Sequence, residues 1–216
     1  MRRIKSSGWG RTLRSTSWEY EPHSRSELQE FISDHDYSRG VITHGLRRSY
    51  GDSSLNIGGV SIDPTFLSEI SFHQDSTLAT VGAGVSIGSL EKVALTHKLF
   101  PPVVPGTGFV SIGGAIAADI HGKSHHTTGS FSACVRRIQL LYSDGSIRDL
   151  YPEGPSLDHF WATVGGLGLT GIILEADLQL IAMNEPKVIV EEARVKNLEE
   201  MLSALSASDE RFEHTV

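Results

Sequence analysis

Five glycines and three histidines crowd one stretch of small residues in this chain, residues 105–126. Glycine has no Cβ, so its backbone adopts φ > 0 and its N–H groups can come within hydrogen-bonding distance of an anion. Successive N–H groups in such turns form an anion cradle. A second, more polar glycine loop, residues 43–52, directly follows the apolar pair Val41 and Ile42. Two such loops in one chain indicate a site for an anionic ligand.

Neither loop has the spacing of the common nucleotide motifs. The chain contains no G-x-x-x-x-G-K-[ST], and no strand followed by G-x-G-x-x-G and a helix with an acidic residue about 20 positions on. Eight short segments, taken together and in order, instead resemble the flavin domain of the vanillyl-alcohol-oxidase or PCMH-type FAD oxidoreductases. They are residues 8–11, 47–52, 105–107, 113–117, 119–123, 129–131, 160–166 and 168–173.

The resemblance implies an α+β fold, a PCMH-type FAD-binding domain made of two small α/β subdomains. We expect this domain over residues 1–182. After Glu185 and Pro186 the character of the sequence changes, and a strand over residues 188–195 and a helix capped by Asn197 follow. One strand and one helix cannot bury both of their faces. Residues 183–216 are therefore expected to begin a substrate or cap domain that is incomplete here.

Local signals predict the elements that position both loops. Ser24 and Glu27 have the spacing of a capping box, Ser86 and Ser111 can cap helices over residues 87–97 and 112–117, and Asp144-Gly145 is typical of a hairpin turn. Alternating or continuous apolar runs predict strands, and a helix is expected over residues 157–164. The strands are expected over residues 41–43, 60–63, 78–81, 135–142, 146–150 and 171–180.

By resemblance, the two loops and one later residue hold FAD. Some relatives attach the flavin through a histidine next to the position of Ser49, where this chain has Arg48, so we expect noncovalent FAD; Arg47 or Arg48 is expected to offset the pyrophosphate charge. A helix that begins after Ser111 would add the favourable field of its N-terminus. The alternative for the second loop is a tightly packed crossing of small residues. The expected FAD-binding residues are Thr43, His44, Gly45, Leu46, Arg47, Arg48, Ser49, Tyr50, Gly51, Asp52, Ser53, Gly106, Thr107, Ser111, Ile112, Gly113, Gly114, Ala118, Asp119, Ile120, His121 and Ile173.

Three histidines near Lys123 also suggest metal binding, because imidazole is a common metal ligand. No cysteine or acidic ligand cluster accompanies His121, His125 and His126, so we expect no metal. By resemblance, His121 and Lys123 are candidate catalytic residues beside the redox face of the flavin. Asp119 is expected to pair with a nearby basic residue.

Composition limits the remaining choices. The net charge of −7 argues against nucleic acid as a partner. No apolar run is long enough to span a membrane, and no signal-peptide core follows the basic N-terminus. The single Cys134 excludes an internal disulfide and is typical of a reducing compartment. We therefore expect a cytoplasmic protein.

The resemblance implies hydride transfer from a sugar or alditol carbinol carbon to flavin N5. Within the family the match favours a polyprenyl-phosphate ribose substrate and, with it, a companion keto-reductase, while aldonolactones and alditols stay open. The alternative is a non-catalytic FAD-binding fragment, or half of a split enzyme, because the family places much of the substrate site in the second domain.

Overall fold

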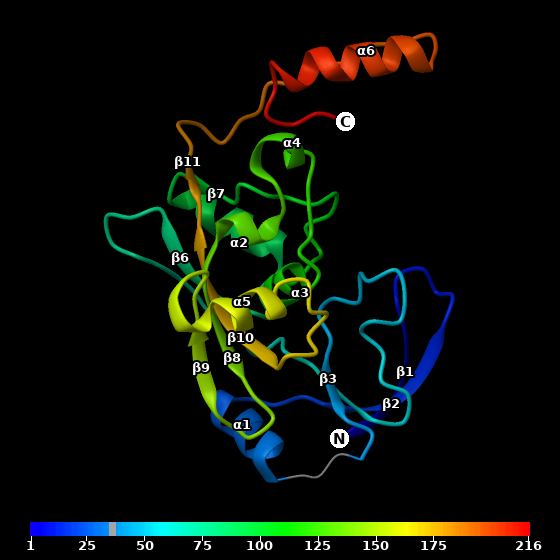
Figure 1. Ribbon diagram of the computed structural model, residues 1–216, viewed down its shortest axis with the longest axis vertical. Coiled ribbons are helices and arrows are strands. Elements are labelled where there is room, and N and C mark those ends of the chain that lie inside the picture. Colours follow the sequence, from blue (N-terminus) through cyan, green and yellow to red (C-terminus); the bar gives the residue numbers. More distant parts are fainter. Residues whose placement is uncertain (35–37) are drawn as a thin grey trace.

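The computed structural model describes residues 1–34 and 38–216, in which two main β-sheets lie side by side (Figure 1). The first sheet has the order β1-β2-β4-β3. Its strands are β1 (Arg2–Ser7), β2 (Arg14–Tyr20), β3 (Val41–Thr43) and β4 (Val60–Ile62). β1 and β2 are antiparallel, whereas β4 is parallel to both β2 and β3. The parallel pairing places the first glycine loop between β3 and β4, at the carboxyl end of β3.

The second sheet is antiparallel throughout and has the order β5-β6-β10-β8-β9. Its strands are β5 (Ile70–Phe72), β6 (Leu78–Gly82), β8 (Val135–Leu141), β9 (Ile147–Leu150) and β10 (Ile172–Gln179). The predicted hairpin is confirmed: Gly145 has φ +78° in the turn between β8 and β9. A short pair, β7 (Leu99–Phe100) and β11 (Ile181–Ala182), extends the fold beyond this sheet.

The helices begin where the capping signals predict. Ser24 Oγ accepts from the Glu27 N–H, and Ser86, Ser111 and Asn197 each accept from the N–H three residues on. The helices are α1 (Arg25–Asp34), α2 (Ile87–Thr96), α3 (Ile112–Ala117), α4 (His125–Thr128), α5 (Leu157–Thr163) and α6 (Leu198–Asp209). Two 3₁₀ turns cover Phe131–Cys134 and Gly154–Ser156. None of the helices in the described part of the chain is long and apolar enough to cross a membrane.

One hydrophobic core joins the two sheets. Ile62 of the first sheet, Ile138 and Leu174 of the second, and Ile112 and Ile116 of α3 are all fully buried in the same cluster. Burying an aliphatic side chain of this size is worth about 1.5–3 kcal/mol, so this shared core fixes the sheets against each other. The loops that leave both sheets are thereby held at one place.

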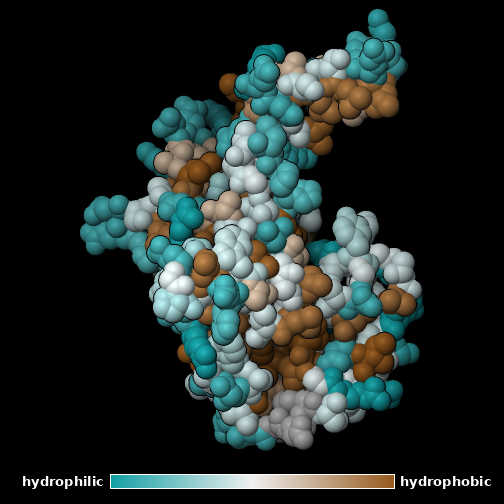
Figure 2. All heavy atoms as spheres, viewed as in Figure 1, coloured by the Kyte–Doolittle hydropathy of each residue, from teal (hydrophilic) through white to brown (hydrophobic). Residues whose placement is uncertain are grey.

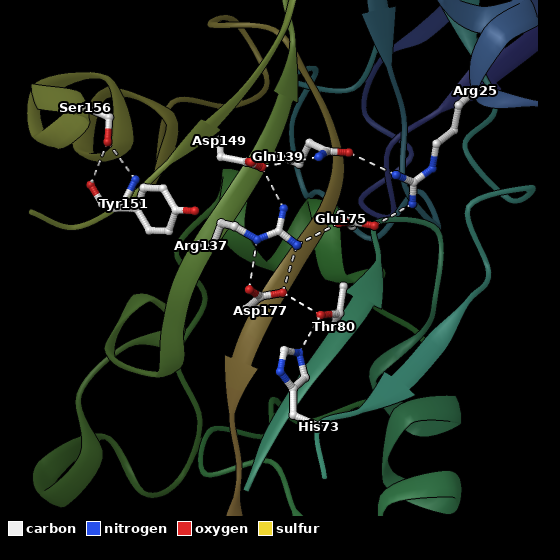
Figure 3. Close-up of polar contacts among 10 residues, drawn as sticks. All are labelled: Arg25, His73, Thr80, Arg137, Gln139, Asp149, Tyr151, Ser156, Glu175 and Asp177. Carbon is white, nitrogen blue, oxygen red and sulfur yellow. Dashed lines mark hydrogen bonds and ion pairs between the residues drawn. The ribbon is translucent and has the colours of Figure 1, made fainter. Parts of the chain in front are cut away.

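A charged network on the outer face of the second sheet ties α1 to it (Figure 3). Arg137 of β8 donates to Asp149 of β9 at 2.7 Å, and to Glu175 and Asp177 of β10 at 2.7 and 2.8 Å. Arg25 at the start of α1 bonds the same Glu175. The helix that leads into β3 is therefore anchored by ion pairs as well as by its buried face.

The C-terminal part differs from its prediction in one respect. Residues 188–195 form no strand, although their Val and Ile content favours one. Val188, Ile189 and Val190 are at least 70% exposed, because no neighbouring strand lies beside them to take their hydrogen bonds. α6 is present as predicted but carries no buried residue. It lies at the end of the molecule opposite the first sheet, with apolar side chains uncovered along one side (Figures 1 and 2).

Candidate functional site

The first glycine loop offers a row of free backbone donors. None of the N–H groups from Gly45 to Ser53 donates a hydrogen bond to any described residue. Backbone N–H groups almost always find an acceptor, in the protein, in water or in a ligand. Nine consecutive unpaired donors after a strand therefore suit an anionic ligand, as the glycines predict.

The structure brings the two glycine segments together. Gly45 lies directly against Ser111, and a Cβ built on Gly45 would stand 2.2 Å from Ser111 Oγ and 4.0 Å from Gly114 Cα. Ser111 is also the residue that caps α3. The loop after β3 and the segment that opens α3 thus form one continuous surface, which their separation in the sequence does not reveal. Contact with FAD stays a prediction for Gly106, Thr107 and the other residues expected to bind it.

The N-terminal segment packs on the same loop. Trp9 N–H donates to Ser49 O at 2.7 Å, and the Trp9 ring meets Tyr50 edge-on at 5.4 Å. A Cβ on Gly8 would stand 2.3 Å from Gly51 O, so only glycine allows this approach. A hollow of about 430 Å³ opens here, lined by Ser7, Gly8, Trp9, Arg11, Arg47 and Arg48.

The start of α3 differs from the expectation that its N-terminus faces the ligand. Ile112 N–H donates to Val85 O, Gly113 N–H to Ala83 O, and Gly114 N–H to Ser111 Oγ. These donors are used inside the protein because α3 packs across the turn that follows β6. A Cβ on Gly113 would lie 3.1 Å from Ala83 Cβ, so the tight crossing of small residues is present here. The first N–H groups of α3 are therefore not free to bind a ligand.

Asp119 does not pair with a basic residue as expected. Its carboxylate accepts from Ser130 Oγ at 2.8 Å and from Ser132 N–H at 2.9 Å. These bonds hold the segment from Ala118 to His121 against the turn at Ser130, so Asp119 shapes the loop. No local pattern predicts these contacts, because the two serines follow eleven and thirteen residues later.

His121 and Lys123 are exposed on a pinned loop. A Cβ on Gly122 between them would lie 2.2 Å from Val104 O, so the backbone passes too close for any other residue. The His121 ring contacts His125 edge-on at 5.3 Å. Both side chains are accessible to a ligand, and their catalytic role stays a prediction. Ile120, between Asp119 and His121, packs against the core.

A cavity of about 350 Å³ lies between the two sheets. Its lining includes Val41 and Thr43 from the first sheet, Leu141 from β8, and Leu169 and Ile172 from the end of the 168–173 segment. Thr43 Oγ1 is buried and has no hydrogen-bond partner among the described residues. The lining also includes the polar side chains of Tyr142, Ser143 and Thr170, so the cavity is only partly apolar; a cavity of this size suits a flat heteroaromatic ring. Ile173 itself is 6% exposed and belongs to the core, so its neighbour Ile172 lines the cavity.

A buried ionic cluster, which sequence reasoning missed, lies beneath the first loop. The Glu19 carboxylate, 4% exposed, accepts from Arg2 at 2.6 Å and from Arg47 at 2.7 Å, and His44 Nε2 lies 3.2 Å from it. Burial alone would raise the pKa of Glu19, but the hydrogen bond from Arg2 and the charges of Arg47 and His44 hold the pKa below its ordinary value. Arg47 therefore pairs with Glu19, and which of Arg47 and Arg48 offsets a pyrophosphate charge stays a prediction. Arg48 lies over the Phe109 ring instead, 5.6 Å from its centroid.

The same cluster contains the one group of potential metal ligands found in residues 1–34 and 38–216. Ligand atoms of Glu19, His44 and Asp63 lie within 4.8 Å of one another. Two guanidinium groups already occupy the Glu19 oxygens, and their charge repels a cation. The group is thus an ion-pair cluster of the fold.

Comparison with known proteins decides the family. A family model described as an FAD binding domain matches residues 19–151, which contain both glycine loops and most of the second sheet. The chain belongs to the PCMH-type FAD-binding oxidoreductases. FAD is the cofactor of this family.

Several relatives have names that describe an activity, and three of them are compared with this chain. The chain is 47% identical over 176 residues to decaprenylphosphoryl-beta-D-ribose oxidase of Mycolicibacterium smegmatis, covering 80% of this chain and 38% of that protein. It is 32% identical to an FAD-linked oxidoreductase of Aspergillus niger, over 60% of this chain and 24% of the relative, and 32% identical to an alditol oxidase of Streptomyces, over 49% and 25%. The chain thus spans between 24% and 38% of the length of these relatives.

The residues present fit FAD. A dinucleotide needs hydrogen-bond donors for its pyrophosphate, and the unpaired N–H groups of residues 45–53 supply them next to Arg48. It also needs a slot for a ring, and the cavity between the sheets begins at Thr43, just before this loop. No covalent attachment is required by this arrangement.

Proposed function

We propose that this chain holds FAD noncovalently, with the pyrophosphate on the backbone of residues 45–53, and serves the oxidation of a sugar or alditol alcohol. The observation that carries the proposal is the row of nine N–H groups without an acceptor among the described residues, closed on one side by Ser111 and on the other by Trp9. Donors fixed in this way need no reorganisation when the anion binds.

FAD, when bound, supplies the acceptor for a hydride from the alcohol carbon. The chain's own contribution is to bind and orient. His121 can accept or donate a hydrogen bond, and the Lys123 ammonium can hold a phosphate or an alcohol oxygen; both lie on the loop that Gly122 pins against Val104. We assign these two side chains to orienting the substrate.

We propose a polyprenyl-phosphate pentose as the substrate, and an alditol as the second candidate. The names of the relatives from M. smegmatis and Streptomyces support these two classes, which share a secondary alcohol beside further hydroxyl groups. A positively charged Lys123 favours the phosphate-bearing substrate over a neutral alditol. The keto product would require a separate reductase to yield an inverted alcohol.

We also propose that residues 183–216 are a unit separate from the FAD-binding domain over residues 1–182. β11 ends at Ala182 by pairing with β7, and after it no residue of the described chain is buried. Polar contacts with the first unit are few among the described residues. Thr215 N–H donates to Lys123 O and Met183 N–H to Lys98 O, and His126 Nε2 donates to Phe212 O and lies 3.8 Å from Asp209 Oδ1.

The test combines binding and reduction. FAD is titrated into the purified chain by fluorescence, and the complex is then precipitated with acid; all flavin should appear in the supernatant. Flavin that stays in the pellet would contradict noncovalent binding, and a chain that takes up no FAD would contradict the site.

Anaerobic loss of flavin absorbance on addition of polyprenyl-phosphate ribose or an alditol tests the reaction. Lys123→Met should slow the loss with the phosphorylated substrate and leave FAD affinity unchanged. Lys92→Met, an exposed lysine on α2, is the matched control. FAD binding without bleaching by either substrate would favour a non-catalytic FAD-binding module.

A further inference from the structure

We infer that Glu19 is a positioning residue for the FAD loop: its buried carboxylate contacts both Arg47 and His44, and so fixes the backbone of residues 45–53. The inference rests on the proposed FAD site. It assigns a role to a strand residue 26 or more positions before the loop that it controls.

Both carboxylate oxygens of Glu19 are used. Oε1 accepts from Arg47 Nη2 at 2.7 Å, and Oε2 accepts from Arg2 Nη2 and Nε at 2.6 and 2.9 Å. Glu19 is 4% exposed, and a charge at that depth persists only when it is paired. Arg2 comes from β1 and Arg47 from the loop, so one carboxylate joins the loop to the sheet.

His44 extends this connection to the first glycine. Its Nδ1 lies 2.8 Å from Gly45 O, and since a carbonyl only accepts, Nδ1 carries the proton. Nε2 lies 2.9 Å from Arg47 Nη2 and 3.2 Å from Glu19 Oε1, so the imidazole packs against both members of the ion pair. Glu19, Arg47, His44 and Gly45 thus form one hydrogen-bonded series that ends where the free N–H groups begin.

The backbone of Arg47 needs this support. Arg47 has φ +56°, in the left-handed region that side-chain-bearing residues avoid and glycine tolerates. Such a conformation persists when its surroundings hold it. The ion pair to Glu19 supplies that constraint, and the turn that it maintains directs the following N–H groups outward.

Other polar groups beneath the loop do not replace Glu19. Asp63 carries the same charge as Glu19 and faces His44 in the same cluster. The buried hydroxyls of Ser17 and Ser61 have no hydrogen-bond partner among the described residues. Among the described residues, none of Asp63, Ser17 and Ser61 forms an ion pair or hydrogen bond with Arg2 or Arg47.

The test is a double-mutant cycle on FAD affinity, with the unfolding midpoint of the apo chain measured in parallel. Glu19→Gln keeps the shape and removes the charge, and should raise the Kd for FAD about ten- to a hundredfold, as expected for the loss of charge-assisted hydrogen bonds. Glu21→Gln is the matched control, because Glu21 also pairs with Arg2, at 2.7 Å, but does not touch the loop. It should change the Kd by less than about twofold.

Arg47→Gly separates positioning from general stability. Glycine adopts φ +56° without strain, so in this background Glu19→Gln should change the Kd by less than about threefold. If Glu19→Gln only lowered the stability of the fold, independently of the loop, it would raise the Kd by the same factor in both backgrounds.

Three results would overturn the inference: a Glu19→Gln chain that binds FAD as tightly as the wild type or more tightly, an equal loss from Glu21→Gln, or the same loss from Glu19→Gln in both backgrounds. These leave the FAD site itself intact. A wild-type chain that binds no FAD would remove the site and the positioning role together.

Discussion

Gly51 offers the sharpest test of where the cofactor approaches the backbone. A Cβ built on Gly51 meets no atom within 4 Å, and its φ lies outside the left-handed region. Gly51→Ala should therefore leave the apo chain as stable as the wild type, or more stable by about 0.4–1 kcal/mol, because alanine has fewer unfolded conformations to lose. If FAD lies on this loop, the added methyl group intrudes on it. Overpacking costs about 1–3 kcal/mol, which corresponds to a rise in Kd of about 5- to 150-fold.

Gly45→Ala is the contrasting variant. Its Cβ would stand 2.2 Å from Ser111 Oγ, so the serine must turn away and release the Gly114 N–H that it caps. Loss of a cap costs about 1 kcal/mol, so Gly45→Ala should weaken both FAD binding and apo stability. Urea denaturation of the apo chains and FAD titration separate the two effects. A Gly51→Ala chain with unchanged FAD affinity would show that the cofactor does not approach residue 51, and one with reduced apo stability would refute the open space around it.

Two further predictions concern the second sheet. Burial raises the pKa values of Glu175 and Asp177, but the hydrogen bonds from Arg137 outweigh it and hold both below their ordinary values; the stability they contribute is therefore complete above about pH 5 and is lost as pH falls through the lowered pKa values. Arg137→Met should lower the free energy of unfolding at neutral pH by about 1–3 kcal/mol and flatten its decline in acid, and a wild-type acid profile in this variant would contradict the pairing. Burial raises the pKa of the Cys134 thiol to about 12, so iodoacetamide at about pH 8 should label it only after denaturation, as mass spectrometry would show; rapid labelling of the native chain would contradict its burial.

Local chemistry explains which elements the sequence predicted. The caps at Ser86, Ser111 and Asn197 and the turn at Asp144-Gly145 depend on residues within three positions, and all four are present. The strand predicted over residues 188–195 is absent, because a strand also needs a neighbouring strand, which β-propensity does not supply. The family and the cofactor were predicted from the resemblance. The apolar core was predicted from strands in which apolar and polar residues alternate.

β2, one of the strands that were not predicted, bears on the interpretation of Arg47. β2 buries Ser15, Ser17 and Glu19 on one face, so its buried positions are polar and hydrophobic alternation cannot reveal it. Without β2 there is no reason to place Glu19 under the loop, and an arginine beside a glycine turn is then naturally assigned to a phosphate. In the structure Arg47 instead pairs with the buried Glu19 carboxylate, whereas Arg48 lies over the Phe109 ring. Because the buried face of β2 is polar, the hydrophobic pattern reveals neither this strand nor Glu19 as the partner of Arg47.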